Sequence, residues 1–508
     1  MLKKAVAFLF TNLLFFVVFS QELPLNYSNS LGDRVEMYTN DSIVNYSIKP
    51  IVPQFHNHLE PRIEKRIYRS LVARKLFFEH LLIIDTSDFY VTIDPLFMVE
   101  GGIDQERVNS DFLLQNTRGF QVKGSWKNKL TFSTSFYENQ GKYPFYLDQY
   151  VKTYNIVPGQ GRVKAFKTGA YDFAMASGRI NYIPNEHLML SLGQDKNFIG
   201  EGYRSFLLSD NAFNYPFVSA QTNFFNRKLN YLFMIAGLQD LLRVQGFALT
   251  ENIFQRKTAS IKYLEYSPNF KIKVGFYEST ISVDALAKQK DGIRGEADYR
   301  FLNPVIGINS AINGMSDSLY FSNQGFNISI RPLKNWLVYG QLALKDYNFS
   351  ALAGQVGIGY YGIKGLFLRG EWNESSNDVF GNLNNSASQT HYNQYLAHPY
   401  GDHFQELLFM ANYRFKRFNA EAAASQTNFY TLTNKEYLIN GAVVDNYKLL
   451  SLRGQLGFTV NPATNMQFNI GWMQRFYDIR ETPDVFLRNT SYIYISFQTA
   501  LTNRYRDF

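Results

Sequence analysis

Apolar and polar residues alternate one by one along much of the chain after Asp88. The alternation is clearest in the ranges 188–193, 270–277, 366–373, 451–458 and 466–472. A period of two places apolar side chains on one face of a strand and polar side chains on the other. The pattern therefore predicts antiparallel strands with one apolar face, as found in a soluble β-sandwich or in a membrane β-barrel.

The connections between the predicted strands alternate in length. Short turns fall near 127–129, 184–186, 226–228, 267–269, 332–334, 416–417 and 461–463. Long excursions cover 139–171, 195–215, 238–256, 280–317, 374–403, 428–447 and 475–489. Outer-membrane barrels have short periplasmic turns and longer extracellular loops. The spacing therefore favours the barrel, with long loops outside and both termini in the periplasm.

The predicted fold is an all-β, transmembrane, outer-membrane antiparallel β-barrel over residues 86–508, with about eighteen strands, an even number as in bacterial barrels. In the last strand Ile493, Ile495 and Phe497 alternate with polar neighbours. A final strand followed by the aromatic Phe508 is similar to the signal that directs barrels into the outer membrane. We therefore expect Phe508 to belong to that signal.

Residues 1–20 have the pattern of a secretory signal peptide. Lys3 and Lys4 precede an apolar run, and small residues stand before Gln21. The alternative is an N-terminal membrane anchor, but the apolar run is short for a spanning helix. The polar stretch 21–54 is predicted to be an extended periplasmic leader.

Residues 55–85 differ from the rest of the chain, because apolar residues recur there at near-helical spacing. Arginine and lysine residues fill the positions between them. This pattern predicts a basic amphipathic helix or a pair of helices. Such a segment can lie on a membrane surface or fold into the lumen of a barrel.

Composition agrees with secretion and with a barrel. Aromatic residues make up 17% of the chain, while the mean hydropathy is only −0.24. Alternation dilutes the apolar residues of a barrel, and aromatic girdles mark its interfaces. There is no cysteine, which excludes disulfides and thiolate metal sites. The formal charge of +8 is compatible with anionic glycans or lipid phosphates, and no nucleic-acid motif occurs.

No catalytic or cofactor motif stands out. The chain has no Gly-x-Ser-x-Gly elbow, and the Gly-Glu-Gly at 200–202 lacks the rest of a phosphate loop. The pair His56 and His58 has no further ligand at a fitting spacing, so neither a metal nor a cofactor is predicted. We expect a protein that is not an enzyme.

One polar loop dominates the candidate chemistry. The strand 188–193 leads into a segment that extends to Asn211 and is rich in charged and amide side chains. Its sequence contains Gly-Gln-Asp-Lys at 193–196 and Gly-Glu-Gly-Tyr-Arg-Ser at 200–205, followed by Leu-Ser-Asp-Asn at 208–211. A second such segment is His-Pro-Tyr-Gly-Asp-His-Phe-Gln-Glu at 398–406.

These two segments resemble the signature of the Wzi-like capsule-assembly outer-membrane proteins, and among them the gliding-motility members from Bacteroidota. The resemblance extends over most of the chain after about Pro50. It implies an eighteen-stranded barrel with a helical plug, and for this reason we favour the plug for residues 55–85. It also implies surface polysaccharide as a partner, together with outer-membrane lipid and proteins of the gliding or secretion machinery.

The resemblance and the polar chemistry select twelve candidate ligand-binding residues. They are Gln194, Asp195, Glu201, Tyr203, Arg204, Ser205, Asp210, Asn211, His398, Tyr400, Asp402 and Glu406. In one interpretation they face a glycan, with Arg204 gripping a carboxylate. In the other they hold the loop in place, with Arg204 in an internal salt bridge.

Alternation also assigns charged residues to the lumen. They are Lys271, Lys273, Arg369, Glu371, Glu421 and Arg453, which either line a channel or pair with one another and with the plug. The predicted function is a non-enzymatic surface protein engaged in gliding motility or in exopolysaccharide attachment. The alternatives are a diffusion porin and an outer-membrane glycan or lipid hydrolase.

Overall fold

The computed structural model describes most of the chain after residue 46. The described residues are 47–52, 70–107, 112–127, 129–243, 254–269, 271–283, 299–313, 320–381, 387–430, 438–439, 442–443, 446–478, 489–499 and 505–508. The predicted signal peptide lies outside these residues and stays a prediction.

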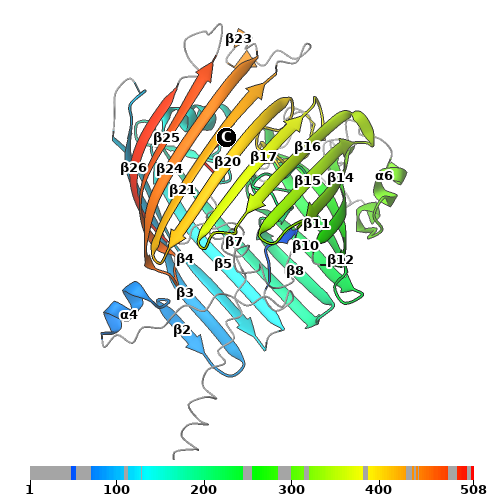
Figure 1. Ribbon diagram of the computed structural model, residues 1–508, viewed down its shortest axis with the longest axis horizontal. Coiled ribbons are helices and arrows are strands. Elements are labelled where there is room, and N and C mark those ends of the chain that lie inside the picture. The colour runs from blue at the N-terminus through cyan, green and yellow to red at the C-terminus, as the bar shows by residue number, and fades with distance from the viewer. Residues whose placement is uncertain are drawn as a thin grey trace, which may run out of the picture.

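Most of the described strands form one closed antiparallel sheet, and eighteen of them make up its ring (Figure 1). The ring consists of β3 (Phe89–Asp104), β4 (Phe112–Trp126), β5 (Leu130–Gly141), β7 (Ala170–Asn185), β8 (Leu188–Asp195), β10 (Tyr215–Phe224), β11 (Leu229–Arg243), β12 (Phe254–Asn269), β13 (Ile272–Val283), β14 (Tyr320–Ile330), β15 (Trp336–Lys345), β16 (Asn348–Tyr360), β17 (Leu366–Ser375), β20 (Phe404–Phe415), β21 (Phe418–Phe429), β24 (Tyr447–Asn461), β25 (Met466–Asp478) and β26 (Thr490–Gln498). Pairing of β26 with β3 closes the ring, with Tyr492 opposite Asp104. The predicted barrel of about eighteen strands is confirmed.

Shorter elements accompany the ring. β2 (Leu82–Asp85) pairs only with β3, and β6 (Lys164–Phe166) only with β7. Three further sheets have two strands each. They pair β1 (Ile48–Lys49) with β9 (Phe198–Ile199), β18 (Thr390–His391) with β19 (Gln394–Tyr395), and β22 (Leu438–Ile439) with β23 (Ala442–Val443). The helices are α4 (Leu71–Phe77), α5 (Phe145–Tyr154), α6 (Ile308–Asn313) and the 3₁₀ helix η4 (Tyr299–Leu302). No helix among the described residues is long and apolar enough to cross a membrane.

The alternation in the sequence corresponds to the two faces of the barrel wall. On β8, Leu190 and Leu192 are exposed on the outside, while Met189 and Ser191 are buried on the inside. On β26, Ile495 is likewise exposed on the outer face. An outward apolar face fits a hydrocarbon environment and an inward polar face fits a lumen. The facing predicted for these strands is confirmed.

The two ends of the barrel differ as the connection lengths predicted. At one end every connection between described strands is short, for example 225–228 and 361–365. At the opposite end most connections are long, and we call this the long-loop end. The exception there is the hairpin between β15 and β16, which turns on Asp346 and Tyr347, with φ of 53° and 58°.

One long excursion lies on the outside of the wall. Residues 299–313, with η4 and α6, cover outward-facing positions of β12 and β13 (Figure 1). Lys262 and Glu278 point outward but are buried there, 3.0 Å apart. Asn309 and Ser310 of the excursion donate hydrogen bonds to this patch. The excursion was predicted as an extracellular loop, which stays a prediction, and its described part covers a polar patch on the outer face of the wall.

The barrel interior is filled by chain segments, and two of them are loops from the long-loop end. They are the loop 196–214 and the described parts of the loop 376–403, and their backbones meet where the amide of Ser209 donates to Leu396 O at 2.6 Å. The end of the predicted leader also enters, because Val52 packs against the inward-facing Ile183 and Met189. Residues 505–508 are a further part of the filling. The predicted helical plug is therefore not what the described part of the lumen contains.

The described part of segment 55–85 lies at the short-turn end of the barrel. There Nδ2 of Asn461 donates to the carbonyl oxygens of Lys75 and Glu79, both at 2.9 Å. No residue of α4 is buried, and Figure 1 shows α4 and β2 beside the rim rather than within the ring. The first part of the predicted plug, up to residue 69, lies outside the described residues.

Candidate functional site

The loop 196–214 carries most of the predicted site and is folded into the lumen. Nζ of Lys196 ties the two ends of the loop together, because it donates to the carbonyl oxygens of Gly159 and Asp210 at 2.8 and 2.9 Å. Gly200 has a φ of 136°, and a Cβ there would collide with the side chain of Gln341. Glycine is required at this position because the loop backbone passes directly against the wall.

Arg204 is the centre of the site and is completely buried. Its Nη2 lies 3.3 Å from Oε1 of Glu406 and 3.2 Å from Oδ2 of Asp507. Its guanidinium also stands over the rings of Tyr203 and Tyr400, 4.8 and 5.7 Å from their centroids. A buried arginine needs such partners, since an unpaired buried charge costs several kcal/mol. Of the two interpretations of Arg204, the internal salt bridge is the one observed.

His398 joins the second predicted segment to this cluster. Its Nε2 donates to Oε2 of Glu406 at 3.0 Å, while Nδ1 accepts the backbone N–H of Tyr400 at 3.2 Å. This arrangement suits a neutral imidazole, and burial lowers the pKa of His398 to about 4. The ring stacks on Phe206 and Phe404. The structure therefore brings Tyr203, Arg204, His398, Tyr400 and Glu406 together.

Glu201 belongs to a separate buried cluster. Its carboxylate forms an ion pair with Lys273 and accepts a hydrogen bond from Ser47 at 2.9 Å. Oε2 of Glu265 lies 4.0 Å from the same ammonium group, and Asn327 donates to Ser47. This cluster fixes the leader residue Ser47, the loop and the three strands β12, β13 and β14 to one another.

The remaining predicted residues each have a different setting. Asp195 pairs with Arg179 at 3.1 Å, and Ser205 donates to the carbonyl of Ile199. Asn211 donates to Ala397 O, and Asp402 accepts the backbone N–H groups of Val379 and Phe380. Asp210 accepts from Tyr505. Gln194 is exposed on the outer face of β8, away from the others. Ligand binding by these twelve residues stays a prediction.

The structure adds residues that the sequence prediction of the site omitted. Arg453 and Glu371 were assigned to the lumen by alternation, and both contact Tyr203. Asp507 had no such signal, because it follows the last strand and was expected near an insertion signal. Phe508 is also not on the last strand, since its carbonyl accepts from Arg475 inside the barrel. Phe508 therefore does not belong to the last strand, and its expected part in the insertion signal stays a prediction. Of the other predicted luminal charges, Lys271 is instead exposed at a turn.

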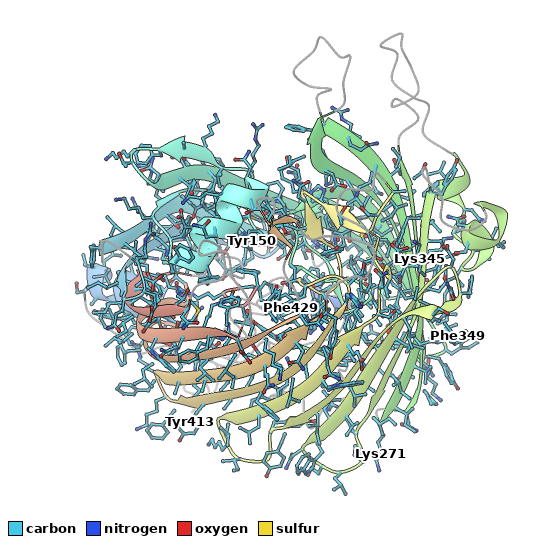
Figure 2. The ribbon with its side chains drawn as sticks, turned by 90° about the horizontal axis from the view of Figure 1, so that it is seen from above. Tyr150, Lys271, Lys345, Phe349, Tyr413 and Phe429 are labelled. Carbon is cyan, nitrogen blue, oxygen red and sulfur yellow. The ribbon has the colours of Figure 1, made fainter. Side chains whose placement is uncertain are left out.

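A pocket lies at the long-loop end, between α5 and residues 505–508. Its lining includes five aromatic side chains, Tyr143, Tyr146, Phe173, Tyr505 and Phe508, and two amides, Gln115 and Gln160. Gln160 is buried, and its Oε1 accepts from the hydroxyl of Tyr137 at 3.2 Å. Its Nε2 has no partner among the described residues. Figure 2 shows Tyr150 of α5 toward the middle of the ring, while Tyr413 and Lys271 lie at its edge.

Among the described residues no group of histidine and acidic side chains has the arrangement of a metal site. The charged side chains here are paired, including Arg506 with Glu100, and the pocket offers aromatic faces and amide groups. Such a lining can contact part of a polyhydroxylated ligand by stacking and hydrogen bonds.

Comparison with known proteins places the fold. No family model and no curated protein sequence matches the chain. Among solved structures it is similar to Wzi of Escherichia coli, an outer-membrane protein involved in group 1 capsule assembly and described as a carbohydrate-binding β-barrel. The TM-score is 0.55 at 12% identity, over 94% of this chain and 99% of Wzi.

Two other solved structures are more distant. OccK7 of Pseudomonas aeruginosa gives a TM-score of 0.46 at 8% identity, over 82% of this chain and 99% of OccK7. OccAB1 of Acinetobacter baumannii gives 0.45 at 10% identity, over 80% and 96% of the two chains. These two likenesses are too weak to support an argument. The chain has an outer-membrane-type β-barrel fold similar to that of Wzi.

Proposed function

We propose that this protein is a non-enzymatic outer-membrane surface protein that binds polysaccharide at its long-loop end. The observation that supports this function best is the filled lumen. The loop 196–214, the described parts of the loop 376–403 and residues 505–508 lie inside the ring. Buried ion pairs join them to one another, as in Arg204 with Asp507, and to the wall, as in Arg204 with Glu406 on β20. A barrel filled in this way presents a surface rather than an aqueous channel.

The pocket beside α5 is the proposed contact point for the glycan. The aromatic side chains of Tyr146 and Phe508 offer apolar faces for sugar rings. The unpartnered Nε2 of Gln160 can donate to a hydroxyl. The likeness in fold to Wzi, a carbohydrate-binding barrel, supports the same ligand class.

The biological setting is a finer part of the proposal. The motifs at 193–211 and 398–406 resemble those of the gliding-motility protein RemB. We therefore place the bound glycan in exopolysaccharide attachment or in gliding, with proteins of that machinery as further partners.

The test is glycan binding by the purified, folded barrel on an array of bacterial polysaccharides. Gln160→Ala is expected to weaken binding of the selected glycan roughly tenfold, the effect of losing one buried hydrogen bond. Gln426→Ala removes the same side chain from an exposed, outward-facing position of β21 and is the matched control. Equal effects of the two substitutions would exclude the pocket.

Single-channel conductance separates this function from that of a diffusion porin. A filled barrel should pass little current in a planar bilayer, whereas a porin conducts steadily. Large, stable conductance together with no glycan binding would favour the porin.

The orientation is also proposed, with the long-loop end outside the cell. Phe349 lies next to the hairpin at that end and Phe225 lies in a short turn, and both are 77% exposed. Since the chain has no native cysteine, Phe349→Cys should react with a membrane-impermeant thiol reagent on intact cells, and Phe225→Cys should not. The reverse pattern would invert the barrel.

A further inference from the structure

Residues 505–508, Tyr-Arg-Asp-Phe, lie in the lumen and not in the barrel wall. The last strand of the ring ends at Gln498, and Tyr505 and Asp507 are about as buried as core residues, at 5% and 4% exposure. Each of the four residues has its own partners on surrounding elements. The segment is held as a bound peptide ligand would be.

The two charged side chains of the segment, Arg506 and Asp507, each contact partners of the opposite charge. Arg506 donates to both carboxylate oxygens of Glu100 on β3, with Nη1 at 3.1 Å from Oε1. Asp507 lies 3.2 Å from Arg204 and 3.5 Å from Arg453 on β24, and it accepts from the hydroxyl of Tyr203 at 2.9 Å. A cation and an anion next to each other in the segment thus meet a complementary anion and two cations.

The two aromatic residues fix the ends of the segment. The hydroxyl of Tyr505 donates to Asp210 in the loop 196–214. The carbonyl of Phe508 accepts from Arg475 on β25, and its ring lies against Tyr150 of α5, with centroids 6.2 Å apart. The four residues therefore connect the inner loop to three different strands and to α5.

Two arginines that contact this segment keep buried N–H donor groups without a hydrogen-bond acceptor among the described residues. Arg453 keeps a buried Nε, and Arg475 a buried Nε and Nη1, without a partner among the described residues. A site with spare donors can accept another peptide or carboxylate in place of the one it holds. Buried donors without a partner are uncommon in native proteins, and here three of them lie on the two arginines that contact the segment.

We propose that the lumen contains a binding site for a short peptide of the type aromatic–cation–anion–aromatic, and that residues 505–508 occupy this site in the same chain. While bound, the segment closes the space between the loop 196–214 and the wall formed by β3, β24 and β25. Its release exposes the site to a partner peptide of the same chemistry. Peptide binding at this site is a function separate from glycan binding at the pocket beside α5.

The first test measures how well the segment is protected. Tyr505→Cys in the full chain, purified and folded, should react slowly with a small thiol reagent, with the exposed Phe349→Cys as the reference. Adding Glu100→Gln should accelerate the reaction roughly a hundredfold, because the buried Arg506 loses its charged partner. The charge swap of Glu100→Arg with Arg506→Glu should slow it again. Protection that is absent, or unchanged by Glu100→Gln, would overturn the proposal.

The second test supplies the segment from outside. A fluorescent Tyr-Arg-Asp-Phe peptide, blocked at both ends, is added to the full chain carrying Arg506→Ala and Asp507→Ala. The peptide should bind this variant and not the native chain, whose site is filled. The inverted peptide Tyr-Asp-Arg-Phe should bind at least roughly tenfold more weakly, since both of its charges meet like charges. Equal binding of both peptides, binding to the native chain, or no binding would overturn the proposal.

Gel mobility with and without heating shows that each variant is folded. If the double variant does not fold, the labelling experiment alone decides the question. A negative result here leaves the glycan proposal intact, because that proposal is tested at Gln160 and by a different ligand.

Discussion

The outer wall and the lumen of this barrel are built from the same strands, yet their side chains are stabilised in different ways. On the outer wall the side chains of Leu192, Ile358 and Ile495 are exposed. Inside, Arg204 and Lys273 are buried and have partners far away in the sequence, such as Asp507, 303 residues from Arg204. The wall therefore depends on local alternation, whereas the lumen depends on contacts that form only when the ring has closed.

The patch of β12 and β13 under residues 299–313 is an exception to this difference between outer wall and lumen. There the outward-facing Lys262 and Glu278 form a buried pair as luminal residues do. The covering excursion exposes Leu302 and Val305 in their place. Polar residues on the outer face are thus allowed where another segment supplies the apolar surface, because a bare charge in hydrocarbon is costly.

The largest expected effect concerns the lumen. Arg204→Ala should lower the free energy of unfolding by about 3–5 kcal/mol, because Glu406 and Asp507 would remain buried without their shared cation. Denaturant unfolding of the refolded barrel measures this change. Arg118→Ala breaks the exposed pair with Glu138 and should cost no more than about 1 kcal/mol. Similar losses for the two variants would remove the contrast between lumen and wall.

The same contrast explains how far the sequence could predict the structure. Alternation was sufficient for the ring, its strand number and the facing of Leu190 or Ile495, since each depends on neighbours in one strand. It also placed Arg453 and Lys273 in the lumen. It could not show that Asp507 meets Arg204, because that contact depends on how a loop and a distant segment fold into the ring. The plug was assigned to residues 55–85 by resemblance, and no local pattern marks 196–214 as filling the lumen.

Acid should affect the lumen before the wall, through two buried histidines of the loop 376–403. In His391, Nδ1 accepts the N–H of Gln239 and Nε2 donates to Asn214 O, as suits a neutral ring. Burial lowers the pKa of both His391 and His398 to about 4 from 6.5. The unfolded chain therefore binds more protons between these values, so stability is lost as the pH falls from about 6.5 to 4.

Each histidine should contribute roughly 3 kcal/mol to this loss. Unfolding measured at pH 7, 5 and 4 checks the expectation. In His398→Gln the amide can still donate to Glu406 and accept from Tyr400, but it cannot be protonated in this range. This variant should show a smaller loss in acid than the native chain. An identical pH profile would mean that His398 is already charged in the folded state.

A smaller effect tests the wall itself. Ile495→Asp places a carboxylate on the outer face of β26, beside Ile470 on the neighbouring strand. The cost is at most about 2–4 kcal/mol near the midplane, and less for acids than for lysine or arginine. Ile363→Asp makes the same change in a short turn and should be close to neutral. Assembly yield and unfolding in lipid compare the two, and equal tolerance would show that Ile495 does not face the bilayer.

The smallest expected effect is a gain, at the hairpin where the wall turns without entering the lumen. Asp346 and Tyr347 both have positive φ, which suits the type I′ turn of a two-residue hairpin but strains a residue with a Cβ. Tyr347→Gly should raise the free energy of unfolding by up to about 1 kcal/mol, since glycine adopts this conformation freely. The N–H that donates to Gln324 at 2.8 Å is retained. Tyr347→Ala keeps the Cβ and should bring no gain. If alanine stabilises as much as glycine, removal of the exposed ring is the cause, and the turn is not strained.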